Sequence, residues 1–282
     1  MTLGNIRKMT ARLTADPAFD LVSSVEYNLP IGDENINMNQ FIGKGISLKY
    51  TGTINCVHCG KKTKKSYSQG HCYPCMKKLA SCDMCIMKPE TCHYDQGTCR
   101  EPAWGEDNCM RPHYLYLANS SGDSVKVGIT RETQIPTRWI DQGAIQALAI
   151  AKVQTRLQVG LLEVALKEFV KDKTDWRKML KNDVCETDLA ARRDELFELT
   201  KSAIIELRNR FGVDAIQLID DGEAVRISFP VDEYPEKVKA HNFEKQAEVS
   251  GVLKGIKGQY LILDTGVLNV RKFSGYEVEL LS

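Results

Sequence analysis

Nine of the ten cysteines in this 282-residue chain fall between residues 56 and 109, and most of them form Cys-x-x-Cys pairs. In chain order they are Cys56 and Cys59, Cys72 and Cys75, Cys82 and Cys85, then Cys92, Cys99 and Cys109. Two thiolates three positions apart can bind one face of a tetrahedral metal ion, and a second pair completes the four ligands. Zinc is the ion that this pattern favours. We therefore expect residues 55–112 to form zinc-ribbon-like modules.

The first two pairs predict a structural zinc site made of Cys56, Cys59, Cys72 and Cys75. Twelve residues separate the pairs, which is enough for a short loop to bring the second pair back to the first. Gly60 follows Cys59 and suits a tight turn that directs backbone N–H groups toward the sulfur atoms. Four protein ligands leave no position for water, so we expect no catalysis at this ion.

The spacing of the later cysteines predicts a second zinc site with the ligands Cys82, Cys85, Cys92 and Cys99. Cys109, His93 or His113 can each replace one member of that set, although thiolate is the stronger ligand for a closed site. An iron–sulfur cluster and a thiol or metal sensor are rival interpretations of the same cysteines. Disulfides are disfavoured because the chain opens without an apolar signal segment, which predicts reduced thiols and a cytoplasmic location.

The composition predicts a folded protein of about two domains, since 282 residues are 43% hydrophobic. No apolar run is long enough to span a membrane. Short alternating apolar runs separated by Gly and Pro predict β segments at 1–54 and 213–282. These segments either pack together as one discontinuous domain or form separate domains. We expect an α+β fold, with the cysteine-rich region at 55–112 and a small mixed α/β domain with a long helix at 113–212.

The formal net charge is +1, so an acidic partner must meet a local basic patch. The segment between Thr51 and Cys82 contains no Asp or Glu and has aromatic residues among its lysines. Lysines beside aromatic rings can neutralise phosphates and stack on bases. The alternative is a solvated rim that keeps the module soluble. The predicted nucleic-acid-binding lysines are Lys61, Lys62, Lys64 and Lys65.

Two strands, a short helix and a longer helix are expected after the cysteines. The strands cover 113–118 and 124–130, and a helix that begins near Pro136 presents Arg138. A second helix contains Glu163, and the apolar residues at 157, 161, 164, 165 and 169 predict its buried stripe. A third helix is expected to run without a break from Thr187 or Asp188 to Gly212.

The order of these motifs resembles the GIY-YIG endonuclease superfamily. The resemblance covers residues 113–180 and rests on Tyr114-Leu115-Tyr116, Lys126-Val127-Gly128-Ile129-Thr130, and then Arg138 and Glu163 on successive helices. The whole chain also resembles a cysteine-rich bacterial family, the domain of unknown function 2797, through the stretches 69–75 and 138–144. That second likeness implies no activity.

The superfamily likeness implies a divalent-metal-dependent phosphodiesterase. Tyr116 would lie near the attacking water, Gly128 would let the backbone approach the scissile phosphate, Arg138 would neutralise charge on it, and Glu163 would bind Mg²⁺ or Mn²⁺. Lys126 stands where the superfamily has a second tyrosine. It can hold phosphate as a point charge, but it is a poor base near neutral pH.

The same residues also have plainer interpretations. Tyr114 and Tyr116 can pack on one face of a strand, Gly128 can relieve a crowded sheet, and Arg138 and Glu163 can form an ordinary ion pair. A zinc-bearing protein that binds DNA, RNA or a protein partner without cutting it is therefore the alternative to a nuclease. Tyr114 and Gly128 are expected to contact nucleic acid in either case.

Overall fold

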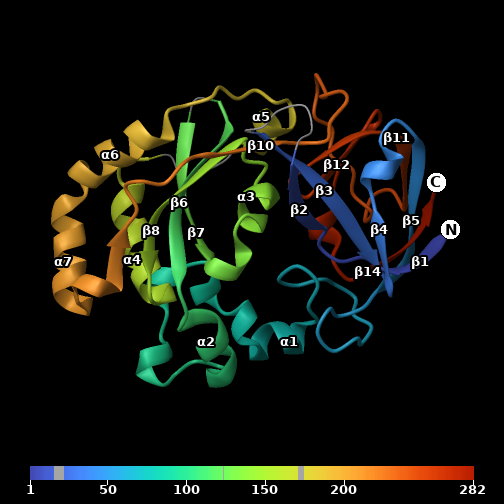
Figure 1. Ribbon diagram of the computed structural model, residues 1–282. Coiled ribbons are helices and arrows are strands. Elements are labelled where there is room, and N and C mark those ends of the chain that lie inside the picture. Colours follow the sequence, from blue (N-terminus) through green and yellow to red (C-terminus); the bar gives the residue numbers. More distant parts are fainter. Residues whose placement is uncertain (16–21, 123, 171–174) are drawn as a thin grey trace.

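The computed structural model describes residues 1–15, 22–122, 124–170 and 175–282, and these residues form an α+β fold with two β-sheets (Figure 1). The α+β class expected from the sequence is confirmed. In the first sheet every neighbouring pair is antiparallel, and strands from both ends of the chain lie side by side. Its order is β1 (Thr2–Asn5), β14 (Tyr276–Leu281), β5 (Gly45–Ile54), β11 (Glu248–Lys257), β12 (Tyr260–Leu263) and β13 (Gly266–Asn269).

The second sheet joins N-terminal strands to those that follow the cysteine-rich region. One pair, β3 with β10, is parallel, and the other described pairs are antiparallel. The strand β7 lies at one edge of this sheet. The order is β2 (Thr10–Ala15), β3 (Val22–Ile31), β10 (Val225–Ser228), β8 (Gln146–Val153), β6 (His113–Ser121) and β7 (Ser124–Arg131), with β4 (Glu34–Asn37) on β3 and β9 (Ile216–Leu218) on β8.

Side chains of β6 alternate between two hydrophobic cores, as the two-residue period of a strand requires. Leu115 and Leu117 join the core that includes Leu162 and Leu166 of α4 (Arg156–Lys167). Tyr116 instead joins the core that includes Trp139 of α3 (Thr137–Asp141) and residues of both sheets. The helices α3 and α4 therefore cover opposite faces of the sheet near its β7 edge (Figure 1).

The expected long helix is two helices, α6 (Leu189–Leu199) and α7 (Lys201–Phe211), preceded by α5 (Trp176–Leu180). The break lies at Thr200, where the backbone leaves the helical region at φ −105° and ψ 10°. The buried Thr200 hydroxyl donates to the Leu196 carbonyl at 2.7 Å, a contact that commonly bends helices. The α6 and α7 pair packs over the α4 side of the sheet (Figure 1).

The cysteine-rich region lies below the two sheets in Figure 1 and contains little regular structure. Its helices are α1 (Tyr73–Lys78) and α2 (Pro102–Cys109), with the 3₁₀ turns η2 (Ala80–Cys82), η3 (Met84–Ile86), η4 (Pro89–Thr91) and η5 (Tyr94–Gln96) between them. None of the three hydrophobic clusters formed by the described residues includes a residue between 55 and 114. Something other than apolar burial must therefore hold this region together.

The remaining 3₁₀ turns lie outside the cysteine-rich region. They are η1 (Asn39–Phe41), η6 (Glu132–Gln134), η7 (Val213–Ala215) and η8 (Val270–Phe273). Throughout the described ranges, every helix is too short or too polar to cross a membrane.

Candidate functional site

The first four cysteines converge on one point, as their spacing predicts. One Sγ atom from each of Cys56, Cys59, Cys72 and Cys75 lies within 4.8 Å of the other three, and the Cys59 and Cys72 sulfurs are 3.8 Å apart. A tetrahedral zinc with Zn–S bonds of about 2.3 Å requires sulfur atoms about 3.8 Å apart. A disulfide would bring them to about 2.0 Å. The cysteine cluster is confirmed, and its geometry can hold a zinc ion.

Backbone hydrogen bonds around this cluster favour the thiolate form of Cys56, whereas burial and hydrogen bonds to the other three cysteines raise the pKa of Cys75. Burial by itself would raise the pKa of Cys56, but backbone hydrogen bonds from Cys59, Cys72 and His58 lower the pKa to about 6. Gly60 makes the turn with φ +71°, and its N–H donates to the Cys56 carbonyl at 2.9 Å. Gly60 therefore has the turn-forming role expected from the sequence.

The later cysteines gather around a closed cavity of about 10 Å³. Three of the expected ligands, Cys85, Cys92 and Cys99, line it. Cys109 is the fourth cysteine there, whereas Cys82 is not among the described residues that line the cavity. His93 also lies on its wall, but His113 lines a different space.

A second, larger cavity of about 510 Å³ is strongly basic, and we call it the basic cavity. Seven basic side chains and two carboxylates line it, which leaves an excess of five positive charges. His113 and residues 127–130 of β7 form another part of the wall. The charged residues are Lys8, Lys126, Arg131, Arg138, Arg156, Lys167, Arg271, Asp141 and Glu163.

Three of the four predicted catalytic residues line the basic cavity. Lys126 comes from the edge strand β7, Arg138 from α3 and Glu163 from α4. Because α3 and α4 cover opposite faces of the sheet, Arg138 and Glu163 approach the β7 edge from its two sides. Thr155 positions α4 through a capping box with Gln158. The fold thus brings together residues that are far apart in the sequence.

The fourth predicted residue, Tyr116, lies behind the cavity wall. Its side chain is fully buried, and its hydroxyl donates to Gln142 Oε1 at 3.0 Å. Burial raises the pKa of Tyr116, and the positive charge of Arg138 together with hydrogen bonds to Arg138 and Gln142 offsets only part of this effect. The phenol therefore stays protonated near neutral pH and helps to position Arg138.

Gly128 also lines the cavity, and its contact with Tyr116 explains the residue type. The two residues are directly opposite each other on β7 and β6. A Cβ atom added at Gly128 would lie 2.5 Å from the Tyr116 hydroxyl oxygen, which is an impossible contact. Glycine is required here for close packing of the tyrosine ring beneath the cavity floor.

The charges in the basic cavity are only partly compensated by one another. Glu163 is 7% exposed and pairs with Lys167 at 3.3 Å, and Asp141 pairs with Lys8. Burial lowers the pKa of Arg271, and the nearby Arg138 guanidinium lowers it further. Cations held close together raise the free energy of the folded protein, and a bound anion would relieve that repulsion.

The predicted nucleic-acid-binding lysines lie outside the basic cavity. Lys61, Lys62, Lys64 and Lys65 are exposed on the loops of the first cysteine cluster. The Lys65 ammonium lies 5.6 Å from the centre of the Tyr67 ring. The same loops contact the cavity wall, because Arg271 Nε donates to Gln69 Oε1 at 2.6 Å.

Tyr114 lies apart from both the basic cavity and the exposed lysines of the first cysteine cluster. It pairs with Lys152, whose ammonium lies 5.6 Å from the ring centre. It is not among the described residues that line the basic cavity.

Sequence patterns gave no sign of several cavity residues. Lys8 and Arg271 come from opposite ends of the chain, and Arg156 lies at the start of α4. His113, which the sequence suggested only as an alternative zinc ligand, is buried, and its ring nitrogen Nδ1 lies 2.7 Å from the Arg111 carbonyl. Only Lys167 had a local signal, because it lies four residues after Glu163 on the same helix face.

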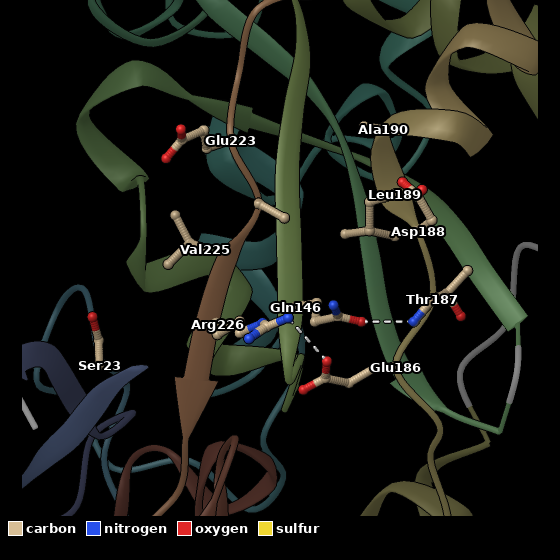
Figure 2. A pocket seen from close by; sticks show the side chains of 11 residues that line it. Ser23, Gln146, Glu186, Thr187, Asp188, Leu189, Ala190, Glu223, Val225 and Arg226 are labelled. Atoms are coloured by element: carbon tan, nitrogen blue, oxygen red, sulfur yellow. Dashed lines mark hydrogen bonds and ion pairs between the residues drawn. The ribbon is translucent and has the colours of Figure 1, made fainter. Parts of the chain in front are cut away.

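Another cavity, of about 770 Å³, lies elsewhere and is not lined by the predicted residues (Figure 2). It is an open groove between β10 and the start of α6. Figure 2 shows Arg226 paired with Glu186, which are 3.2 Å apart, and Gln146 bonded to Thr187 at 3.0 Å. Asp188 there caps α6 by accepting from the Ala191 N–H. These groups already have structural partners, so we take the basic cavity as the candidate site.

Comparison with known proteins identifies the family. A search of curated proteins and a search of solved structures each found no match. Residues 43–278 match the family described as "Protein of unknown function (DUF2797)". The matched range contains both cysteine groups and every lining residue of the basic cavity except Lys8. Since it covers well over half of the sequence, the chain belongs to the DUF2797 family.

Proposed function

We propose that the protein binds nucleic acid in the basic cavity and hydrolyses a phosphodiester there with the help of Mg²⁺ or Mn²⁺. The observation that carries this proposal is the convergence of Lys126, Arg138 and Glu163, from three separate elements, on one concave space with a large cationic excess. Nucleic acid is the common polyanion whose backbone such a space can bind.

The likeness to GIY-YIG endonucleases supports the proposal through the same residues. The hairpin of β6 and β7 carries the two sequence motifs, and the helices α3 and α4 carry the arginine and the glutamate. In this reaction water attacks phosphorus, the bond to the leaving oxygen breaks, and the leaving oxygen takes up a proton. Arg138 can neutralise the phosphate with a planar pair of N–H donors, and Lys126 can hold it as a point charge.

Glu163 fits the role of a ligand for a hard divalent cation. Its carboxylate is almost buried at the cavity wall and is held by Lys167, while the other lining carboxylate, Asp141, already accepts from Lys8 and from Gln259 at 2.8 Å. Mg²⁺ is often bound through one or two carboxylates and several waters. When bound, such a cation supplies charge that stabilises the leaving oxygen.

A binding protein without catalysis is the second candidate, and one observation favours it. No tyrosine is among the described residues that line the basic cavity. Tyr116 is buried and bonded to Gln142, and Lys126 stands in place of the second tyrosine. In this reading the cavity binds the phosphate backbone, and the exposed lysines of the first cysteine cluster extend the contact.

The two candidates can be separated with labelled single-stranded DNA, duplex DNA and RNA, each with Mg²⁺ or Mn²⁺. The nuclease predicts cleavage that Glu163→Gln abolishes while binding persists, because the substitution removes the metal ligand and leaves the cations. Glu206→Gln, on the exposed face of α7, is the matched control and should keep wild-type cleavage. Salt-sensitive binding without cleavage by any variant identifies the binding protein. Absence of both binding and cleavage refutes the proposal.

A further inference from the structure

We infer that Cys85, Cys92, Cys99 and Cys109 form a second metal site, a closed centre of four thiolates suited to zinc. This set differs at one position from the set that spacing predicts, since Cys109 takes the place of Cys82. The four residues come from η3, the end of η4, the turn after η5, and α2. The inference does not depend on the proposed function.

The shape of the cavity favours a single ion. Its volume of about 10 Å³ is close to the smallest space that holds one water molecule. An iron–sulfur cluster with several iron and sulfide atoms does not fit such a space without rearrangement of the walls. Cys92 and Cys109 are buried, and their thiols lie within hydrogen-bonding reach of each other.

The α2 helix explains how Cys109 reaches the same point as Cys99. The Cys99 sulfur lies 3.0 Å from the position that a Cβ atom on Gly105 would occupy. Cys109 is one helical turn beyond Gly105 and therefore lies on the same face of α2. Glycine at 105 leaves room for the Tyr94 ring and the Cys99 sulfur against the helix that carries Cys109.

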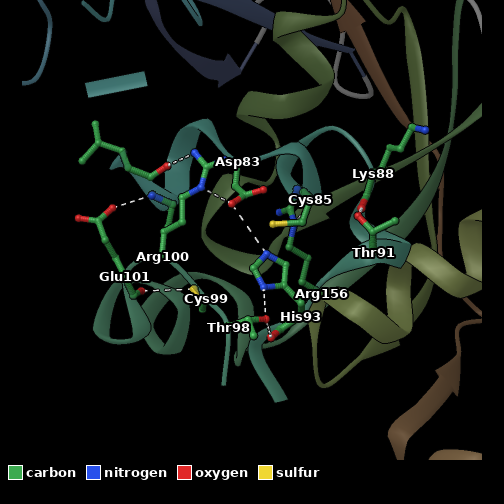
Figure 3. A network of polar contacts seen from close by, with 12 residues as sticks. Asp83, Cys85, Lys88, Thr91, His93, Thr98, Cys99, Arg100, Glu101 and Arg156 are labelled. Carbon is green, nitrogen blue, oxygen red and sulfur yellow. Dashed lines mark hydrogen bonds and ion pairs between the residues drawn. The ribbon is translucent and has the colours of Figure 1, made fainter. Parts of the chain in front are cut away.

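A different grouping, Asp83, Cys85 and His93, brings three ligand atoms within 4.8 Å of one another. Figure 3 shows that its polar members have other partners. The Asp83 carboxylate lies 2.5 Å from Arg100 Nε and 3.8 Å from His93 Nε2, and His93 Nδ1 lies 2.8 Å from the Thr98 hydroxyl. We assign Asp83 and His93 to this hydrogen-bonded network beside the thiols, because thiolate is the preferred zinc ligand.

A metal at this point would stabilise the cysteine-rich region, which needs such support because no hydrophobic cluster of the described residues extends into 55–114. It would also hold one wall of the basic cavity. Arg156 donates to the carbonyls of Cys85 and Ile86 at 3.3 and 2.8 Å, and Gly160 packs against the backbone of η4 so closely that a Cβ atom would lie 2.3 Å from Glu90 N.

The test is the zinc content of the purified full chain, with Cys82→Ser as the matched control for Cys109→Ser. We expect two zinc ions per chain in the wild type and in Cys82→Ser, and one in Cys109→Ser. His93→Ala should also keep two, because His93 is not a ligand in this assignment. One zinc in the wild type, or loss of one ion from Cys82→Ser or His93→Ala, would overturn it. Iron with acid-labile sulfide would also overturn it.

X-ray absorption at the zinc edge separates four thiolate ligands from the Asp83, Cys85 and His93 grouping even if Cys109→Ser does not fold, and Cys82→Ser still separates Cys109 from Cys82. Two tetrathiolate sites give an average of about four sulfur ligands per zinc in the wild type. A second site built from Asp83, Cys85 and His93 gives an average of about 2.5, because its single sulfur is averaged with the four of the first site. An average near 2.5 refutes the assignment.

Discussion

The salt dependence of nucleic-acid binding follows from the charge excess in the basic cavity. Five net positive charges line it. If each charge neutralises one phosphate, a plot of the logarithm of the association constant against the logarithm of the salt concentration has a slope of about −4.5 for duplex DNA and about −3.5 for a single strand. Raising salt from about 50 to about 200 mM then weakens duplex binding about 500-fold and single-strand binding about 130-fold.

Lys126→Gln tests which charges make these contacts. Removal of one phosphate contact reduces the duplex slope by about 0.9, so the same change in salt weakens binding about 150-fold instead of about 500-fold. Lys201→Gln, at an exposed position on α7, changes the formal charge equally and should leave the slope unchanged. Fluorescence anisotropy at four salt concentrations measures both slopes. Equal slopes for the two variants, or a wild-type slope near zero, would refute cavity binding.

Three further predictions concern stability. In urea denaturation, Gly128→Ala should lower the free energy of unfolding by about 1 to 3 kcal/mol, because the new Cβ collides with the Tyr116 hydroxyl. Gly45→Ala is the control and should change the free energy of unfolding little, because the space around Gly45 is open. Burial and nearby arginines lower the pKa of His113 to about 4. In the unfolded chain the His113 imidazole takes up a proton below about pH 6.5, whereas in the folded protein it does so only near pH 4. The free energy of unfolding therefore falls by about 3 kcal/mol as the pH drops from 6.5 to 4. His113→Gln should lack this contribution when denaturation is measured as a function of pH. If the first cluster binds zinc, Cys56→Ser removes one zinc per chain. Hydrogen exchange should then increase within 55–79 more than within α4, because a bound metal would take the place of a hydrophobic core there.

The helix with Glu163 shows why sequence patterns misplaced part of the site. The expected buried stripe was wrong, since Val164 is 43% and Phe169 is 39% exposed. The buried face instead includes Val159, Leu162 and Glu163. Apolar residues surround the whole helix, so periodicity did not identify a unique face. Packing against the sheet selected the face that carries the glutamate.

The two cysteine groups differ in whether short-range spacing or the packing of distant segments brings their sulfur atoms together. Cys56 to Cys75 converge as predicted because each pair is formed within four residues and the connecting loop is short. In the later group, Cys82 and Cys85 also form a pair in sequence, but they belong to successive turns, η2 and η3. The helix α2 brings Cys109 to the cavity instead.

The sequence by itself determined the α+β class, the first cysteine cluster and the order of the motifs with Lys126, Arg138 and Glu163. Those features depend on short-range spacing, which limits the local conformations of the chain. The tertiary structure decided that these three side chains share one cavity with Lys8 and Arg271, and that Tyr116 lies behind it. Strand register and packing of distant segments set those positions, and both depend on contacts across the whole chain.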